Sequence, residues 1–222
     1  MRLREDVMEL MHSPSLVLYL PLYKDDGATF ASRDACGHQC TVTGAAWGPQ
    51  GRQFDGTDDD VVIPHHNAFN VTDFVTMIFW LKWTDNATSQ IVLNKSSSML
   101  HKIYIGTTAK IAHQFYDGVT YLTTTSNGGL VSREMAQVAL VSNFQTPSQG
   151  IKDTYYINGI LDRVTTSGAY SAITTSGNLV RLGWASASGH FFGTMGEVMV
   201  FNRGLTPQEI EHIYLGTKRR YR

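Results

Sequence analysis

Residues 191–216 constrain the fold most, because their pattern predicts a buried strand that runs directly into a short helix. The segment VMVF at residues 198–201 is apolar at every position, as expected where both faces of a strand are covered. The following Thr-Pro-Gln-Glu, which begins at Thr206, matches a capping box with proline at the tolerated first helical position. We therefore predict a helix over residues 207–215, ended by Gly216, that closes a β-rich domain.

Short strands separated by turn signals fill most of the remaining chain. Residues 75–83 alternate as in a central strand that is covered on both faces, and the Asp-Gly and Asn-Gly pairs at 117–118 and 158–159 predict two-residue hairpin turns. Turn signals that recur about every 8–12 residues are typical of a sandwich. At the N-terminus, residues 1–12 have the period of a short amphipathic helix.

Composition excludes several classes of function. The chain has 222 residues, a net charge of −1 and 17% charged residues, so no overall field favours nucleic acid or an anionic membrane. No apolar run approaches membrane-spanning length, and acidic residues occupy the N-terminal stretch where a signal peptide needs its apolar core. We expect a location on a virion or an extracellular surface reached by a non-Sec route, or else in the cytoplasm.

Three motifs carry a resemblance to a known family. They are QFDGTDDDVVIP at residues 53–64, YYING at 155–159 and GTMGEVMVFNRGLTPQEI at 193–210. These segments resemble the FDG-x-DD strand, the Y-V-N-G hairpin and the closing signature of laminin-G-like domains in the concanavalin A-like lectin/glucanase superfamily. The resemblance implies an all-β fold, a two-sheet antiparallel β-sandwich of the concanavalin A-like jelly-roll type, with a short N-terminal helix and one short C-terminal helix.

The resemblance also divides the chain into three parts. Residues 1–15 are predicted to be a helical appendage, residues 16–216 the laminin-G-like jelly-roll domain, and residues 217–222 a basic tail. This fold hosts lectins, glycosidases, adhesion modules and virion proteins, so the fold alone does not determine the function.

A catalytic role is disfavoured by the carboxylates. Glycosidases need two carboxylates held across the sugar, and the laminarinase-like enzymes of this fold carry them in an E-x-D-x-x-E pattern. None of the six glutamates here heads such a pattern. Histidine and tyrosine residues on neighbouring predicted strands leave a polysaccharide lyase open as a less favoured alternative. We predict a protein that is not an enzyme.

Aromatic side chains are candidates for binding a glycan, because a sugar ring stacks its C–H face on an aromatic ring. We place five candidates in or near the concave sheet that the resemblance implies. They are Trp83, Tyr104, His113, Tyr116 and Tyr121. The alternative is that these rings fill the core, and we favour that alternative for Trp80 and Trp47.

Two groups of residues carry metal-binding side chains. Relatives of this fold often hold one structural calcium ion, and the resemblance places such an ion near Asp34, Asp55 and Glu197; the alternative is that these acids cap turns or face water. Cys36 and Cys40, with histidines at 38, 65 and 66, have the donor types of a zinc site, but their spacing does not supply two complete halves. We favour two loop cysteines, free or locally bridged.

Both ends of the chain are candidates for assembly contacts. A lone helix of this length is unstable in water, so its apolar stripe must pack on its own sandwich or on another subunit, and the basic tail suits an acidic neighbour. The predicted assembly residues are Leu3, Val7, Leu10, Met11, Lys218, Arg219, Arg220 and Arg222. We therefore expect a non-catalytic module that assembles with copies of itself or decorates a virion or surface filament, with carbohydrate binding as the alternative.

Overall fold

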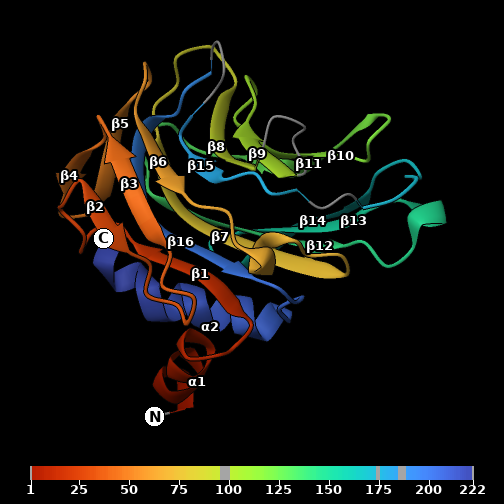
Figure 1. The fold of residues 1–222 in the computed structure, drawn as a ribbon, viewed down its shortest axis with the longest axis horizontal. Helices are drawn as coiled ribbons and strands as arrows, with labels where there is room; N and C mark the ends of the chain where they lie inside the picture. The colour runs from red at the N-terminus through yellow and green to blue at the C-terminus, as the bar shows by residue number, and fades with distance from the viewer. Residues whose placement is uncertain (1, 96–100, 174–175, 185–188, 222) are drawn as a thin grey trace.

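The computed structural model describes residues 2–95, 101–173, 176–184 and 189–221, and Figure 1 shows two layers of strands with helices beneath one of them. The helices are α1 (Arg2–Met11) and α2 (Pro207–Thr217), with 3-10 turns η1 (Asn67–Phe69), η2 (Pro147–Gln149) and η3 (Lys218–Tyr221). The strands, in chain order, are β1 (Leu16–Pro21), β2 (Thr29–Ala31), β3 (Gln39–Thr43), β4 (Ala46–Gly48), β5 (Gly51–Asp55), β6 (Asp60–Ile63), β7 (Phe74–Trp83), β8 (Gln90–Lys95), β9 (His101–Ile105), β10 (Lys110–Tyr116), β11 (Tyr121–Gly129), β12 (Ala136–Asn143), β13 (Lys152–Ile157), β14 (Ile160–Thr166), β15 (Val180–Leu182) and β16 (Phe192–Phe201).

The strands form two antiparallel sheets, which confirms the predicted sandwich. The first sheet has the order β14-β13-β12-β7-β16-β5-β4, with β1 also paired to β16. The second sheet has the order β11-β10-β9-β8-β15-β6-β3-β2. Consecutive strands such as β8, β9, β10 and β11 pair as a meander, whereas β15 and β16 return from late in the chain to the middle of each sheet.

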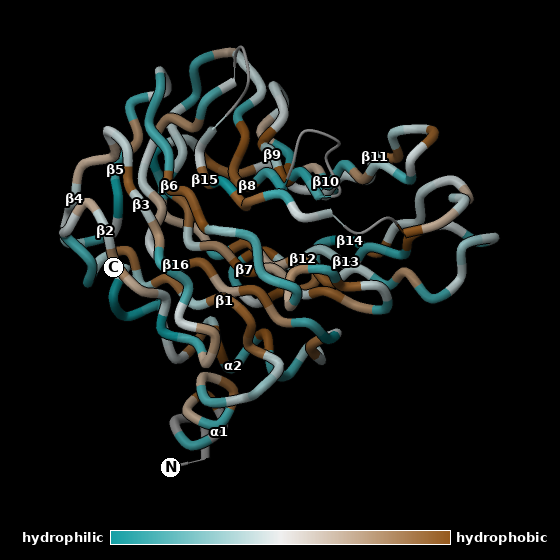
Figure 2. The backbone as a smooth tube through the Cα atoms, in the orientation of Figure 1, coloured by the Kyte–Doolittle hydropathy of each residue, from teal (hydrophilic) through white to brown (hydrophobic). Residues whose placement is uncertain are grey.

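Strand β16 is covered on both faces, as its apolar sequence predicts. Val198 and Val200 belong to the main core between the sheets, where the apolar segments gather in Figure 2. Met199 and Phe201 belong to a second cluster that packs beneath α2. The two faces of this one strand thus pack into two separate cores.

The helix after β16 begins as predicted but ends later. Thr206 Oγ1 accepts a hydrogen bond from the Glu209 backbone N–H, and the Glu209 carboxylate accepts one from the Thr206 N–H, which completes the capping box. Gly216 does not end the helix, which continues through Thr217. A Cβ atom at Gly216 would lie 3.0 Å from Val7, so this glycine lets α1 approach α2 closely.

Helix α1 packs on its own chain. Leu10 is buried in the cluster beneath α2, and Met11 packs against the same cluster. Of the two alternatives for the apolar stripe of α1, its own sandwich or another subunit, the structure shows packing on its own sandwich. The side chain of Leu3 lies outside the described residues. No helix within the described part of the chain is long and apolar enough to cross a membrane.

One of the two predicted hairpin turns is correct. The chain reverses at residues 158–159 with only those two residues between the paired Ile157 and Ile160. Residues 117–118 instead belong to a four-residue connection, because Tyr116 pairs with Tyr121. The Asp117 carboxylate accepts hydrogen bonds from the N–H groups of residues 119 and 120, which favours this longer turn.

Candidate functional site

The outer face of the second sheet is the candidate site. The first sheet carries α2 across its outer face, and Figure 1 shows α1 and α2 on the same side of the molecule. On β9 the inward residues His101, Ile103 and Ile105 are buried, and the alternate residues Lys102 and Tyr104 are half-exposed. The alternation therefore directs a lysine and a tyrosine to the outer face.

Strand pairing joins the outward side chains into a row that crosses the sheet. Residues directly opposite each other on neighbouring strands stand close enough for their side chains to interact. The row follows the register from β11 to β3: Thr123, Gln114, Lys102, Asn94, Arg181, Val62 and Thr41. Amide, hydroxyl and cationic groups dominate this row, which suits hydrogen bonding to a polar ligand.

A hollow of about 340 Å³ lies beside this row. It is lined by Thr88, Ser89, Ile91, Lys102, Tyr104 and Gly189. The Lys102 ammonium lies 5.0 Å from the centre of the Tyr104 ring, within the range of a cation–π contact. Partial burial lowers the pKa of Lys102 and raises that of Tyr104. The hollow thus offers an aromatic face next to hydrogen-bond donors.

Two further aromatic groups lie on or directly after strands of the same sheet. Arg181 donates a hydrogen bond to Asp60 at 2.6 Å and lies 4.5 Å from the centre of the Trp184 ring. Tyr116 and Tyr121 pair across β10 and β11 with ring centres 4.6 Å apart. Tyr121 is 49% exposed, so the paired rings form an accessible aromatic surface at the strand ends.

Two of the predicted glycan-binding residues lie in the core instead. Trp83 is 2% exposed and packs in the core between the sheets, and His113 is 2% exposed on the inward face of β10. Trp47, which we expected in the core, is 46% exposed. All three predictions of side-chain exposure were wrong for the same reason. A sequence pattern can show that a strand has two faces, but it does not show which of them a neighbouring layer covers. Trp80 is buried as expected.

A buried polar network connects the two sheets, and the sequence analysis did not find it. His113 Nδ1 lies 2.8 Å from Asp153 Oδ2, and His101 Nδ1 lies 3.1 Å from His113 Nε2. Thr124 donates its hydroxyl to the same Asp153 oxygen and contacts the Tyr155 hydroxyl at 2.7 Å. Because a carboxylate only accepts, His113 Nδ1 carries its hydrogen, and His113 Nε2 accepts from His101. The signal in the sequence that could have indicated this network is His113, which alternates with the apolar Ile111 and Phe115 on one face of a strand.

We expect the network to make stability depend on pH. Burial, followed by the neighbouring His113 and Lys95, lowers the pKa of His101 well below its usual range. The folded protein therefore keeps His101 neutral, while the unfolded chain binds a proton below about pH 6.5. Stability is fully present above that pH and falls by up to about 1.4 kcal/mol per pH unit below it.

Urea unfolding between about pH 7 and pH 5 measures this loss. His101→Phe should flatten the slope, because the ring lies among Phe115 and Phe144 and phenylalanine does not titrate. The exposed His12 gives the matched control, His12→Ala, which should keep the wild-type slope. An unchanged slope in His101→Phe would contradict the assignment.

The three predicted calcium ligands do not form one group. Asp34 accepts hydrogen bonds from the N–H groups of Tyr19 and Cys36, which is the turn-capping alternative. Glu197 is 1% exposed and binds Arg220 at 2.5 Å and Tyr19 at 3.0 Å. Asp55 instead lies in an acidic group with residues 58 and 59, in which one carboxylate oxygen of each residue lies within 4.8 Å of the other two. Calcium binding stays a prediction.

Two of the predicted assembly residues of the tail have partners within the chain. Arg220 pairs with Glu197, and its guanidinium lies 4.1 Å from the centre of the Tyr23 ring. Lys218 lies 5.1 Å from the centre of the Tyr214 ring. Arg222 lies outside the described residues, and Arg219 is exposed. Residues 218–221 thus continue the C-terminal helix as part of the folded domain.

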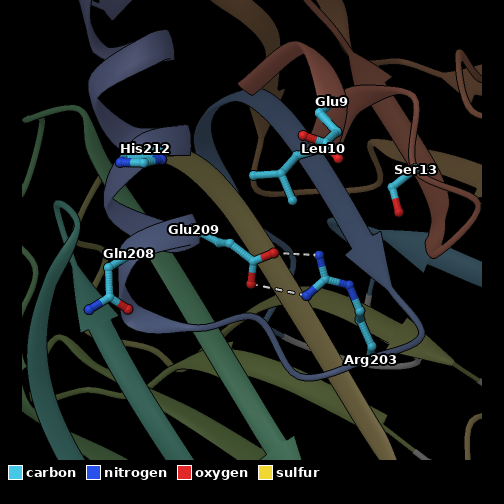
Figure 3. Close-up of a pocket in the computed structure, with 7 residues that line it drawn as sticks. All are labelled: Glu9, Leu10, Ser13, Arg203, Gln208, Glu209 and His212. Atoms are coloured by element: carbon cyan, nitrogen blue, oxygen red, sulfur yellow. Dashed lines mark hydrogen bonds and ion pairs between the residues drawn. The ribbon is translucent and has the colours of Figure 1, made fainter. Parts of the chain in front are cut away.

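A second hollow, of about 330 Å³, lies between the two helices (Figure 3). Arg203 and Glu209 make a two-bond ion pair there, at 2.6 and 3.0 Å. Glu9 and Leu10 of α1 form the opposite wall. The same ion pair also holds Glu209 in the capping box. The position of the two charged groups is therefore explained by the start of α2.

Within the described residues, the fold is a β-sandwich module with helices packed on the outer face of the first sheet and none on that of the second. The family model for the concanavalin A-like lectin/glucanases superfamily matches residues 55–211, more than half of the chain. The chain belongs to this superfamily. No curated protein matches it by sequence.

Solved structures with the same architecture include parts of larger proteins. The binding domain of botulinum neurotoxin serotype D has a TM-score of 0.71 at 14% identity, over 91% of this chain and 52% of its own. The receptor binding domain of the C/D mosaic serotype has a TM-score of 0.73 at 13% identity, over 91% and 51%. Trypanosoma rangeli sialidase has a TM-score of 0.68 at 14% identity, over 95% and 34%. The chain spans about half of these toxin domains and a third of the sialidase.

Proposed function

We propose that this protein is a non-catalytic recognition module that binds carbohydrate on the outer face of its second sheet. The observation that carries the proposal is the hollow at Lys102 and Tyr104, where a half-exposed aromatic ring stands beside a row of amide, hydroxyl and cationic groups. A pyranose needs this combination, since its C–H face stacks on a ring while its hydroxyls take hydrogen bonds.

The carboxylates support binding over hydrolysis. Glu197 is buried against Arg220, and Glu209 is held by Arg203 at the start of α2. Neither stands at the hollow, and the described residues that line it include no carboxylate. A hydrolase of the two-carboxylate kind needs both groups to flank the bound sugar. The geometry of this face therefore favours recognition of a glycan.

Assembly into a virion or surface filament is the second candidate function. A location on such a particle or on an extracellular surface stays part of the proposal. Its sequence support was the apolar stripe of α1 and the basic tail. Leu10 and Met11 pack against their own chain's cluster, and Arg220 pairs with Glu197. Because both features have partners in one chain, the carbohydrate proposal has the stronger support.

Substitution at the hollow tests the proposal. We expect the protein to retain one or more polysaccharides in a native affinity gel, and Tyr104→Ala to weaken that binding at least about tenfold, or about 1.4 kcal/mol. Trp47→Ala is the matched control, because Trp47 is an exposed aromatic residue on the edge strand of the other sheet, and it should bind like the wild type. Equal weakening by both variants, or no retention of any glycan by the wild-type chain, would refute the assignment.

A further inference from the structure

Three side chains that bind transition metals meet at the other end of the second sheet. Cys36 and His38 lie in the connection between β2 and β3, and His66 directly precedes η1. The Cys36 sulfur and one ring nitrogen of each histidine all lie within 4.8 Å of one another. The pairing of β3 with β6 brings these segments together, which the spacing of the residues in the sequence could not show.

His38 is oriented as a metal ligand would be. It is 6% exposed, and its Nε2 lies 2.8 Å from the Val17 carbonyl oxygen. A carbonyl oxygen only accepts, so Nε2 carries the hydrogen and Nδ1 keeps the lone pair. Its ring also stacks on Phe69, with centres 4.7 Å apart. Histidines that ligate metals usually donate the other ring N–H to such a partner, which fixes the ring and the tautomer.

Cys36 is also held in place from behind. Its backbone N–H donates to Asp34 Oδ1 at 2.8 Å, and the other oxygen of Asp34 accepts from the Tyr19 N–H at 2.9 Å. Asp34 thereby anchors the loop to β1. The thiol is free, as is that of Cys40, and Cys40 is buried. Cys36 is therefore the sulfur that a metal in solution can reach.

We propose that Cys36, His38 and His66 bind a zinc ion. Thiolate and imidazole are the donors that zinc prefers, and three protein ligands leave the fourth tetrahedral position to water. Zinc draws its ligand atoms to about 3.5 Å from one another, so the site closes slightly when it binds. His66 is the ligand that moves, because its ring is exposed and its only hydrogen bond given by the described residues, from the Ala68 N–H, is long at 3.2 Å.

Binding releases the thiol proton. A cysteine thiol is largely protonated at neutral pH before a metal arrives. The cation forms the Zn–S bond as the S–H proton passes to the buffer, and no electrons are exchanged. Affinity should therefore increase with pH. Bound zinc links the loop before β3 to the segment after β6 and stabilises the folded state by mass action.

Thermal unfolding with added zinc chloride tests the site. The melting temperature of the wild-type protein should rise when zinc chloride is added. Cys36→Ser and His66→Ala should each weaken zinc binding at least about tenfold. His12→Ala, at an exposed histidine remote in the chain, should bind like the wild type. Zinc shifts of equal size in the wild type and in either ligand variant would overturn the proposal.

A second measurement needs no variant. Iodoacetamide should alkylate Cys36 of the wild-type protein faster than it alkylates Cys40, and zinc should slow the reaction of Cys36 at least about tenfold. Mass spectrometry of the digested protein identifies the modified cysteine. Buried Cys40 serves as the internal control, because its modification requires unfolding. Equal alkylation of Cys36 with and without zinc would also overturn the proposal.

Discussion

Replacing Arg220 with methionine is expected to lower the free energy of unfolding by about 3 kcal/mol at neutral pH. Arg220 Nη1 lies 2.5 Å from Glu197 Oε1, and the Glu197 side chain is 1% exposed. The substitution keeps most of the apolar stem but leaves a buried carboxylate whose remaining partner is the Tyr19 hydroxyl. Removing one member of a buried pair costs more than the pair contributes, because the other charge stays desolvated.

The sign of the pH dependence distinguishes this cause from a loss of packing. Burial raises the pKa of Glu197, and Arg220 and Tyr19 partly offset that effect. In Arg220→Met the pKa rises further, so the folded state holds its proton to a higher pH than the unfolded chain does. Stability of the variant relative to wild type should be best in acid and fall as pH rises.

Urea unfolding of the two proteins at about pH 5 and pH 7 measures the difference. The matched control is Arg219→Met, at the adjacent exposed arginine, which should change stability by less than about 0.5 kcal/mol. If the deficit of Arg220→Met is the same at both pH values, the lost contact is the stacking of the guanidinium on the Tyr23 ring and not the charge pair.

Replacing Asp153 with asparagine is expected to cost about 3 kcal/mol. Asp153 is 1% exposed, and its Oδ2 accepts hydrogen bonds from His113 and from Thr124. The amide has nearly the same shape but no charge, so both bonds lose the strength that an ionised acceptor gives. These bonds join β13 of the first sheet to β10 and β11 of the second, so their loss weakens the contact between the layers.

A double-mutant cycle separates the network from a general effect on the core. Asp153→Asn weakens the bond that His113→Phe removes, so the double variant should cost less than the two single variants added together. Asp26→Asn, at an exposed position, gives the control and should cost less than about 0.5 kcal/mol. Strict additivity of the two core variants would show that Asp153 and His113 do not act through each other.

Local chemistry made the backbone of this protein predictable. The capping box at Thr206 forms because its four residues need only each other. The turn at Asn158 and Gly159 forms because both adopt positive φ angles, 53° and 77°, which those residue types tolerate. The alternation in β16 likewise places two valines in one core and Met199 in another. From such signals the sequence predicts strands, helices and the family.

The candidate sites depended on contacts between segments far apart in the chain. Glu197 was assigned to calcium from the resemblance, yet its partner Arg220 is reached only because α2 and η3 bring it back beside β16. Asp153 and His113 meet because their strands belong to opposite layers. Cys36 and His66 meet because β3 pairs with β6.

The sequence by itself therefore determined which segments are strands or helices and that a two-layer sandwich results, since these follow from hydrogen bonding and burial within short stretches. The tertiary structure decided which side chains face solvent and which charges find partners. Trp83 and Trp47 illustrate the difference, because both are tryptophans on strands, and only the packing of the layers makes one 2% and the other 46% exposed. The burial of a side chain depends on the layer that packs against its face of the strand, and the period of the strand sequence does not predict that layer.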